Sequence, residues 1–401
     1  MFRFTIVLAA ALLYTSGFGA TPEVIDVEPV WSGHPVGFCL LTVGDTQYLG
    51  YYDASRQMTV ASRKLDVATF TFMKLPSHVG WDSHNFIAMA LDSAGQLHVT
   101  GNMHASPLVY FRTTRPGDVT SLVRVPKLVD AAHERRVTYP RFLHTPDGRL
   151  LCKYRDGSSG RGNDLYDVYD AKTETWAPFL HPLLDGFGEV NGYFSLPARG
   201  PDGAYRIVGV WRDTPDAATN HDLSYAQSRD LLHWETAGGW PLRLPLTMHH
   251  IDIVDPVPAH GGMINGNTKL GFDAEQRPII TYHKYDAAGD TQIYAARLEN
   301  GTWVLHPVSD WKGYRWDFGG GGSLVFEVRL GAVHVAEGGA LEMTYRYPHG
   351  RGTWILDPKT LRAVSQARTV RRGPRLPCGL SRVQSSFPGG AEFSGRALRP
   401  S

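Results

Sequence analysis

Short apolar runs that alternate with polar residues dominate the chain after residue 20, and helical periodicity is hard to find. The runs are rich in β-branched and aromatic residues and are separated by Gly, Asp and Pro, which is typical of strands joined by tight turns. The 43 glycines and 26 prolines are spread along the chain rather than gathered in one tract. The pattern therefore predicts an all-β protein without a long flexible linker.

A weak repeat runs through these strands. Each unit has a turn, an apolar strand that ends in polar residues, a loop, and an aromatic strand that is commonly followed by a Trp. Four units begin with turns at 92–95, 146–148, 201–203 and 273–276. Their first strands are expected at 96–100, 149–154, 205–211 and 278–282, and their aromatic strands at 109–112, 168–170, 225–228 and 294–297. Two further units are placed around 59–62 and 353–356.

The repeat length predicts the architecture. Six units spaced by roughly 50 to 70 residues match the four-stranded blade of a β-propeller. We predict one propeller domain over residues 21–362, with a strand at 23–31 that helps to close the ring. Residues 363–401 are rich in Arg, Pro, Gly and Ser and are predicted to be an irregular segment or an incomplete last blade.

The first twenty residues have the pattern of a signal peptide. Arg3 precedes an apolar run at 4–13, and small residues surround Gly19 and Ala20. The apolar run is too short to span a bilayer. We therefore expect a secreted or periplasmic protein without a membrane anchor.

The balance of charges and the number of cysteines limit which ligands and cross-links the chain can have. Forty basic and 39 acidic residues leave no global field that would attract nucleic acid or an anionic membrane, so an anionic ligand would have to meet a local cluster. Cys39, Cys152 and Cys378 are too few and too far apart for a disulfide framework or a four-cysteine zinc site. We interpret Cys39 and Cys152 as small buried side chains and expect a monomer.

Residues at the ends of the inner strands are polar in nearly every unit. They are Asn102, His104, Arg155, Asp156, Arg212, Asp213, His283, Lys284, Tyr345 and Arg346. Equivalent positions in successive blades surround one channel mouth, and converging His, Arg and Tyr side chains are typical of a site for an anion. His84 and His104 flank one predicted hairpin, so we expect both to reach this mouth.

These residue types suit β-elimination in a polymer of uronic acid. The reaction needs a group that neutralises the carboxylate, a base for the C5 proton and an acid for the departing O4. Arg matches a carboxylate, and His and Tyr can transfer protons. The catalytic candidates are His84, His104, Tyr193 and Arg212, the last two from one unit. The candidates for substrate binding are Asn102, Tyr139, Arg141, Arg155, His221, His283 and Lys284.

Metal and phosphate sites are less well supported. His249 and His250 with Asp252 and Asp255 form a candidate metal site, but adjacent strand residues point to opposite faces. We expect catalysis to need no metal or cofactor and leave a structural ion open. Residues 319–322 are four glycines without the following Lys-Ser/Thr of a phosphate loop, and we interpret them as a tight backbone passage between blades.

Six segments carry a resemblance to a known group. They lie at 32–38, 81–85, 101–104, 107–112, 154–157 and 211–213. They resemble the BNR-repeat-like propellers, which include the ulvan lyases and the rhamnosyl-glucuronate lyases of polysaccharide lyase family 42, formerly grouped with rhamnosidases. The resemblance implies a seven-bladed propeller, one blade more than the six readable units. It also implies elimination at a rhamnose–glucuronate linkage.

The resemblance also implies roles for four residues. His84 and His104 would be catalytic or would neutralise the carboxylate, Tyr193 would be base and acid, and Arg212 would neutralise the carboxylate. An α-L-rhamnosidase, with His34 as its nearest matching residue, and a non-catalytic glycan-binding propeller are the alternatives. A hydrolase would normally need paired carboxylates, for which Asp156 and Asp213 are the candidates. The sequence therefore favours an L-rhamnose-α-1,4-D-glucuronate lyase, with an ulvan lyase as the nearest alternative.

Overall fold

The computed structural model describes residues 25–367, and almost all of the regular secondary structure in this part of the chain is β-strand. Two 3-10 helices, η1 (Val119–Ser121) and η2 (Ala217–Thr219), are the helices of this part of the chain. It contains no helix with the length and hydrophobicity of a membrane span. The predicted signal peptide at 1–20 and Cys378 lie outside the described residues. The predicted all-β class is confirmed.

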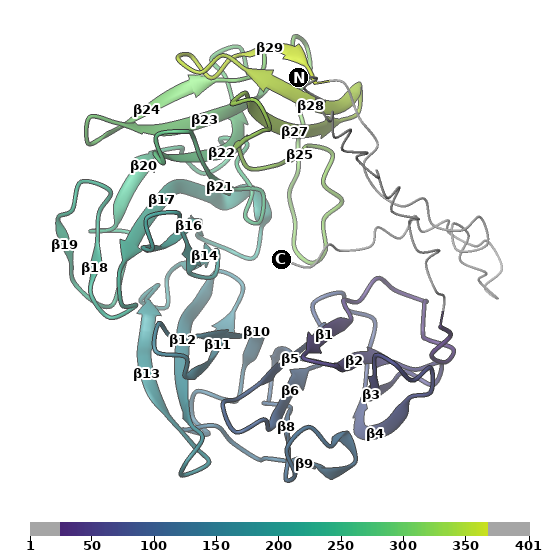
Figure 1. Cartoon of the computed structure of the whole chain (residues 1–401). Helices are drawn as coiled ribbons and strands as arrows, with labels where there is room; N and C mark the ends of the chain where they lie inside the picture. Colours follow the sequence, from purple (N-terminus) through teal and green to yellow (C-terminus); the bar gives the residue numbers. More distant parts are fainter. Residues whose placement is uncertain (1–24, 368–401) are drawn as a thin grey trace, which may run out of the picture. The chain divides into compact units, whose positions relative to one another are not determined.

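The described residues from 28 onward belong to one compact unit, and their strands fall into six successive groups around a common centre (Figure 1). The first group contains β1 (Cys39–Val43), β2 (Thr46–Tyr52), β3 (Gln57–Lys64) and β4 (Thr71–His78). The second contains β5 (Ile87–Leu91), β6 (Leu97–Gly101), β8 (Tyr110–Thr113) and β9 (Leu122–Arg124). The third contains β10 (Val137–His144), β11 (Leu150–Ser158), β12 (Arg161–Asp170) and β13 (Thr175–Leu184).

The remaining groups follow the same antiparallel order. The fourth contains β14 (Asn191–Phe194), β15 (Ala198–Arg199), β16 (Tyr205–Arg212), β17 (Asn220–Ser228), β18 (Trp234–Glu235) and β19 (Pro241–Leu242). The fifth contains β21 (Lys269–Phe272), β22 (Pro278–Tyr285), β23 (Thr291–Glu299) and β24 (Thr302–Pro307). The sixth contains β25 (Arg329–Leu330), β26 (His334–Val335), β27 (Leu341–Tyr347), β28 (Gly350–Leu356) and β29 (Ala363–Gln366).

The third and fourth groups are joined into one twelve-stranded sheet. The join is a parallel pairing of β12 with β14 at Gly162 and Asn191. Two short strands extend the sheet, because β7 (His104–Ser106) pairs with β10 and β20 (Asp252–Asp255) pairs with β17. The loop between β6 and β8 of the second group is thereby attached to the third group.

Apolar side chains from neighbouring groups share a core at each junction, as expected of blades packed face to face. Met58 and Phe111 belong to one cluster between the first and second groups. Ile207 packs in a cluster with Leu151, and Ile280 in a cluster with Val208. Between the fifth and sixth groups the cluster contains Ile279, Ile293, Met343 and Trp354. Cys152 is buried in such a cluster and Cys39 is half-buried, both as free thiols.

The turns form for the reason that the sequence predicts. In the turn at 92–95, Oδ1 of Asp92 accepts hydrogen bonds from the backbone N–H groups of Ala94 and Gln96, and Gly95 has φ of +80°. The four inner strands expected after these turns are confirmed as β6, β11, β16 and β22 within one residue at their starts.

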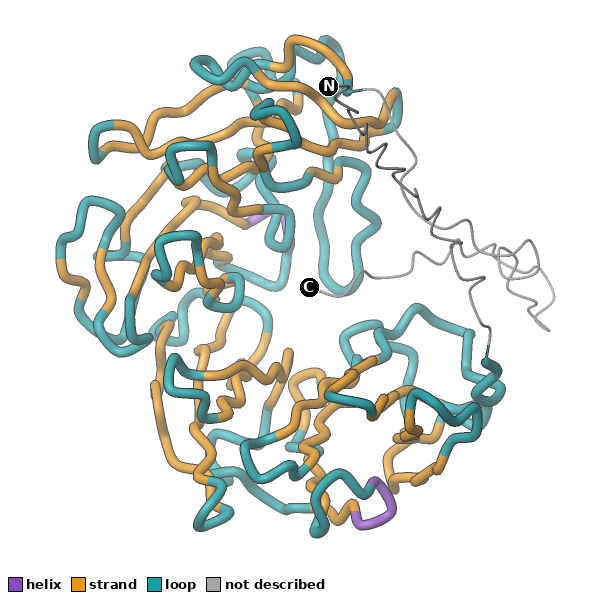
Figure 2. Tube along the Cα trace, in the orientation of Figure 1, coloured by secondary structure: helices purple, strands orange, loops and turns teal. Residues whose placement is uncertain are grey.

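Three expectations concern the ends of the ring. The strand predicted at 23–31 is wrong for its described part, where Val30 makes an isolated bridge with Asp53. The boundary predicted at 362 falls immediately before β29, the outer strand of the sixth group. The seventh blade implied by the resemblance is not among the described residues. Tube and ribbon views show the same six groups (Figure 2).

Candidate functional site

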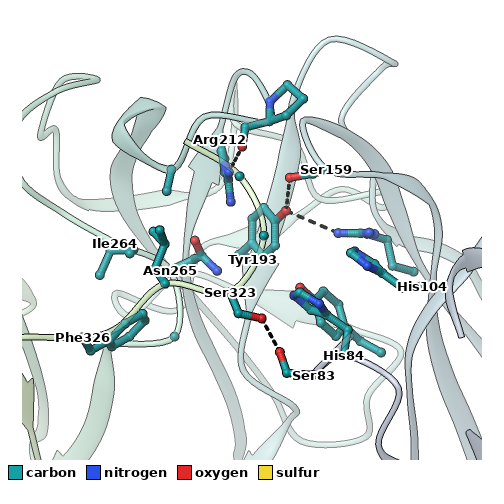
Figure 3. A pocket seen from close by; sticks show the side chains of 18 residues that line it. Ser83, His84, His104, Ser159, Tyr193, Arg212, Ile264, Asn265, Ser323 and Phe326 are labelled. Carbon is teal, nitrogen blue, oxygen red and sulfur yellow. Dashed lines mark hydrogen bonds between the residues drawn. The ribbon is translucent and has the colours of Figure 1, made fainter. Parts of the chain in front are cut away.

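A cavity of about 350 Å³ lies where loops of several blades meet (Figure 3). Its polar lining comes from the third and fourth groups, from β7, and from the loops that precede β5, β21 and β25. The polar side chains are Ser83, His84, His104, Tyr139, Arg155, Ser159, Tyr193, Arg212, Asn265 and Ser323. This set contains cationic and neutral groups but no carboxylate.

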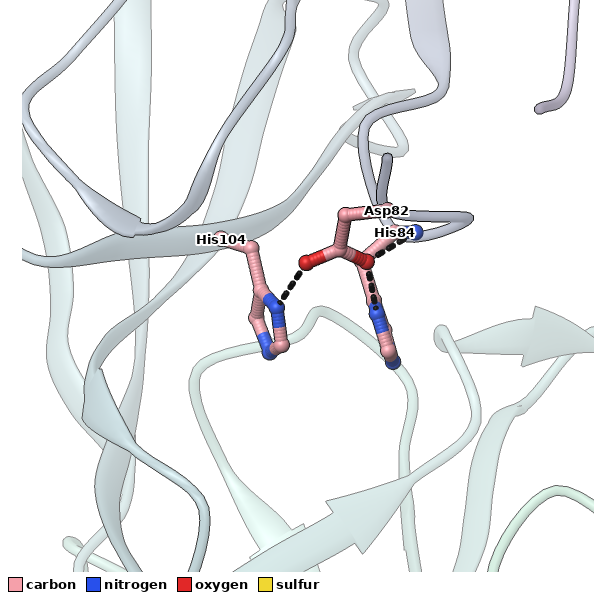
Figure 4. Close-up of side chains that lie close together, drawn as sticks. All are labelled: Asp82, His84 and His104. Atoms are coloured by element: carbon pink, nitrogen blue, oxygen red, sulfur yellow. Dashed lines mark hydrogen bonds and ion pairs between the residues drawn. The ribbon is translucent and has the colours of Figure 1, made fainter. Parts of the chain in front are cut away.

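Two histidines of this cavity are held by one carboxylate (Figure 4). Asp82 Oδ1 lies 2.5 Å from Nδ1 of His84, and Oδ2 lies 2.5 Å from Nδ1 of His104. Asp82 Oδ1 also accepts the backbone N–H of His84 at 2.9 Å, which ties the carboxylate into its own turn. The two imidazole rings stack with centroids 4.0 Å apart. A carboxylate that binds Nδ1–H leaves Nε2 of each ring as the nitrogen free to accept a proton.

The charges of this trio are set by burial and hydrogen bonds. Burial raises the pKa of Asp82, but the hydrogen bonds from His84 and His104 outweigh burial and bring this pKa down to about 2. Partial burial lowers the pKa of His104 from its ordinary value, and the neighbouring His84 and Arg155 act in the same direction against Asp82. An ionised Asp82 beside a neutral His104 is therefore the state expected at neutral pH.

β7 brings His104 to the cavity. Residue 104 opens this strand, which pairs with β10 at Thr138. Oγ1 of Thr138 accepts the backbone N–H of Ala105 at 2.7 Å and Nη2 of Arg155 at 3.1 Å. One hydroxyl thus positions the backbone beside His104 and the guanidinium of Arg155.

Tyr193 occupies the opposite side of the same cavity. Its phenolic oxygen accepts a hydrogen bond from Nη1 of Arg155 at 3.3 Å and lies 2.8 Å from Oγ of Ser159. The guanidinium carbons of Arg155 and Arg212 lie 6.0 Å and 5.6 Å from the centre of its ring. Negative charge on the phenolic oxygen would therefore face two fixed positive charges.

Arg212 is held by the turn that follows β16. Its Nε donates to the carbonyl oxygens of Thr214 and Asp216 at 3.0 and 3.2 Å, and its Nη2 donates to that of Pro215. Within the described part of the chain, Nη1 is left without a protein acceptor. Because Tyr193 on β14 pairs with Val210 on β16, the expectation that Tyr193 and Arg212 belong to one blade is confirmed.

A bulge aims Tyr139 at the cavity. The register of β10 against β11 shifts between Thr138 and Arg141, and Tyr139 between them has φ of +55°, which is unusual for a residue with a side chain. Its ring lies 5.0 Å from the guanidinium carbon of Arg155. Burial raises the pKa of Tyr139 to about 12, so this phenol keeps its proton and can donate a hydrogen bond.

The loop before β25 forms another wall of the cavity. Gly320 donates its N–H to Oδ1 of Asp216 at 2.7 Å, and its carbonyl accepts the N–H of Ala217 at 2.8 Å. Farther along the loop, the hydroxyl of Ser323 hydrogen-bonds that of Ser83. The glycines at 319–322 are exposed, and a Cβ at Gly320 or Gly322 would meet no atom within 4 Å, so the tight backbone passage predicted there is wrong.

The trio of Asp82, His84 and His104 is also the group of described residues whose ligand atoms lie close enough to share a metal ion. Ligation by Nδ1 would require both rings to give up their hydrogen bonds to Asp82. The arrangement fits two oriented imidazoles better than a metal cage.

Comparison with known proteins is consistent with this architecture. A model of a BNR repeat-containing family matches residues 46–311. The chain belongs to this BNR repeat-containing family. The match runs from β2 to β24 and includes the strands that carry His104, Tyr193 and Arg212.

Short stretches of the BNR-repeat chain are similar to curated ulvan lyases. The long isoform from Pseudoalteromonas sp. (strain PLSV) is 40% identical over 62 residues, and that from Alteromonas sp. (strain LOR) is 39% identical over 62 residues. Each alignment covers 16% of this chain, and the chain spans only 6% of the length of either relative.

Solved structures show the same fold over most of the BNR-repeat chain. The polysaccharide lyase Uly1 aligns with a TM-score of 0.58 at 15% identity, covering 88% of this chain and 86% of Uly1. A PL25 ulvan lyase bound to -[GlcA(1-4)Rha3S]- also aligns with a TM-score of 0.58, at 14% identity and 86% coverage of both chains. These similarities confirm the propeller-type fold.

The structure brings together the four side chains expected to be catalytic in this BNR-repeat protein. His84, His104, Tyr193 and Arg212 line the cavity, accompanied by Tyr139 and Arg155 from the predicted binding set. Arg141 lines a second cavity that adjoins the first. The expected convergence of imidazole, phenol and guanidinium groups from separate blades is therefore present.

Four predicted binding residues lie elsewhere. Asn102 donates Nδ2 to Ser77 and His78 and braces a loop. His221 is buried between Asp213 and Asp222, which outweigh burial and raise its pKa.

His283 and Lys284 are also turned away from the two cavities. His283 is fully buried beside Trp316, and burial lowers its pKa to about 4. Lys284 pairs with Asp255 at 2.6 Å. Their placement in this mouth was wrong because strand twist and bulges direct equivalent strand ends differently.

The candidate metal site at residues 249–255 is not assembled. His250 binds Thr247 and the carbonyl of Arg243, whereas Asp252 accepts the N–H of Ala237. Asp255 is the partner of Lys284. Each group is satisfied separately, so these residues do not form a shared ion cage.

Sequence reasoning missed five polar residues of the site. Asp82 lies within the segment 81–85, and its spacing of two residues before His84 is the pattern of an Asx turn. Ser83, Ser159, Asn265 and Ser323 lie in loops, and no local pattern distinguishes them from solvent-exposed loop residues.

Proposed function

We propose that this protein is a polysaccharide lyase that cleaves beside a uronate by β-elimination. The observation that carries the proposal is one cavity with two carboxylate-anchored histidines, a tyrosine beside two arginines, and no lining carboxylate. Similarity to ulvan lyases over 62 residues supports the same class.

The role proposed for each side chain follows from its charge and from whether it can give or accept a proton. Arg212, through its free Nη1, would neutralise the substrate carboxylate, and Tyr139 would hydrogen-bond the same group. Nε2 of His104 would take the C5 proton, because Asp82 holds its other nitrogen as N–H. His104 is therefore the proposed base. The resemblance implies that Tyr193 is both base and acid, but here Tyr193 keeps only the role of acid.

The proposed step moves one proton from C5 to His104 and one proton from Tyr193 to O4. The C5–H electrons become the C4=C5 double bond, the C4–O4 bond breaks, and O4 takes the proton of the Tyr193 hydroxyl. Arg155, which donates to that phenolic oxygen at 3.3 Å, stabilises the charge left behind. Solvent exchange then moves a proton from His104 to Tyr193 and resets the site.

We further propose a rhamnose–glucuronate linkage as the bond cleaved, of the L-rhamnose-α-1,4-D-glucuronate type. The resemblance of residues 81–85 and 101–104 to the propeller group that includes the rhamnosyl-glucuronate lyases supports this choice. One solved relative is bound to a glucuronate–rhamnose oligosaccharide, which supports the sugar pair. Export, expected from residues 1–20, would place the enzyme where such polymers occur.

The hydrolase alternative gains no support from the cavity. Asp156 pairs with His133 at 2.8 Å and Asp213 pairs with His221 at 2.9 Å, and neither lines the cavity. His34 packs near Trp81 and is not among the lining residues either.

Product analysis tests the proposed function. The protein is incubated with rhamnose-capped, glucuronate-bearing arabinogalactan and separately with ulvan. We expect the near-ultraviolet absorbance of an unsaturated uronate to rise with the first polymer, together with release of rhamnose. Absorbance from ulvan alone would reassign the enzyme to the ulvan lyases. Saturated fragments would indicate a hydrolase, and binding without fragments would indicate a glycan-binding module.

The pH dependence should report on His104. The neutral imidazole is the active form, and its pKa lies below the ordinary value near 6.5. Activity should therefore hold as the pH falls through about 6.5 and decline only below it. In Asp82→Asn, loss of the carboxylate should shift this acid limb to still lower pH while kcat falls. The measurement is kcat against pH; an acid limb centred above 6.5 would contradict the assignment.

A further inference from the structure

A second cavity, of about 410 Å³, adjoins the proposed catalytic cavity. The two share Tyr139, Arg155, Tyr193, Asn265 and Gly266 in their walls. A ligand that reaches past Tyr193 would therefore enter the second cavity directly. Its size is within the range of small-ligand sites.

Cations from separate blades line this second cavity. Arg141 comes from β10, Lys153 and Arg155 from β11, and Lys269 from the first residue of β21. One carboxylate, Asp164, shares the lining. Four positive groups thus face one negative group across a half-buried space.

The single carboxylate is already committed. Asp164 pairs with Lys153 at 2.8 Å, and both side chains are buried. Arg155 donates hydrogen bonds from Nη1 to the Tyr193 hydroxyl and from Nη2 to the Thr138 hydroxyl, and both acceptors are neutral. This leaves Arg141, Arg155 and Lys269 without an ion pair to a carboxylate among the described residues.

Arg141 and Lys269 are held in place by other contacts. The guanidinium carbon of Arg141 lies 3.5 Å from the centre of the Phe86 ring. Nζ of Lys269 donates to the carbonyl of Gly266 at 2.7 Å. Burial lowers the pKa of both side chains, as expected where a positive charge lacks an anion. An oxyanion between them would relieve that cost.

We propose that this second cavity, containing Arg141, Arg155 and Lys269, binds an oxyanion, and that the sugar next to the reacting uronate delivers it as a sulfate or carboxylate substituent. The delivery by substrate rests on the proposed lyase function; the anion site itself does not. Among substrates with a rhamnose–glucuronate linkage, the cavity would then favour those that carry a second charged group beside the cleaved bond.

The test compares the full-length protein with the Arg141→Gln/Lys269→Gln variant. Inorganic sulfate is titrated without sugar while Tm is followed, and kcat/KM is measured on sulfated and chemically desulfated glucuronate–rhamnose oligosaccharides. Lys172→Gln, an exposed turn residue outside both cavities, is the matched control. Lys269→Gln alone serves if the double variant does not fold.

We expect sulfate to raise the Tm of the wild-type and Lys172→Gln proteins, and the double variant to lose most of that shift. The preference for sulfated over desulfated oligosaccharide should fall at least ~10-fold in the double variant. Loss of the Tm response alone would identify a free inorganic anion as the ligand. No change in either measurement would overturn the proposal. A third outcome separates the two proposals. If the wild-type protein cleaves no polymer, but sulfate raises its Tm and not that of the double variant, the lyase function is refuted and the anion site stands.

Discussion

Tyr193→Phe is expected to abolish most elimination activity while leaving substrate binding nearly intact. The change removes one oxygen, the atom that lies 2.8 Å from Ser159 and accepts a hydrogen bond from Arg155. Because that oxygen supplies the proton for the departing O4, kcat should fall by about 10²- to 10⁴-fold, the usual worth of a positioned proton donor. KM should change little, since the aromatic ring stays between the two arginines.

The measurement is the initial rate of near-ultraviolet absorbance on the polymer that gives the stronger product signal. Tyr205→Phe is the matched control, because Tyr205 begins β16 in the same blade and does not line the cavity. A Tyr193→Phe protein with wild-type kcat and wild-type Tm would remove Tyr193 from the mechanism.

His104→Gln should cause the second large loss. The variant keeps a polar side chain but cannot accept the C5 proton, so we expect kcat to fall by about 10²- to 10⁴-fold. The acid limb of the pH profile should disappear with it, because His104 is the group proposed to titrate there. His84→Gln should reduce kcat less and retain that limb, since His84 is assigned no proton transfer.

Comparison of the two histidine variants shows which histidine is the catalytic base and which one only positions it. Both rings bind Asp82 through Nδ1 and stack at 4.0 Å, so either loss disturbs the other ring. Only loss of the base should remove the pH dependence. If His84→Gln lost the acid limb and His104→Gln kept it, the two roles would be exchanged.

The sequence predicted the strand framework well because turns and alternation are local properties. Asp92 and Gly95 determine a turn through contacts within four residues, and β6 follows as expected. The convergence of the four proposed catalytic residues could also be predicted, since His84 and His104 flank one hairpin and Tyr193 and Arg212 lie on paired strands.

The rest of the site depends on contacts that sequence spacing does not encode. The bulge that aims Tyr139 arises from a register shift between β10 and β11. Lys284 and His283 were expected at the mouth from their place at a strand end, yet one pairs with Asp255 and the other is buried beside Trp316. Which way a strand end faces is decided by its neighbours, and a single sequence does not contain that information.

The loop that carries Ser323 has a consequence for biosynthesis. It meets Ser83 across a separation of 240 residues, so the histidine side of the cavity leaves the ribosome long before its opposite wall exists. A nascent chain that has folded its first blades would present Asp82 and its two imidazoles to solvent without a pocket. The enzyme proposed here would thus become competent only late in its own synthesis, when the sixth strand group draws this loop across the earlier blades.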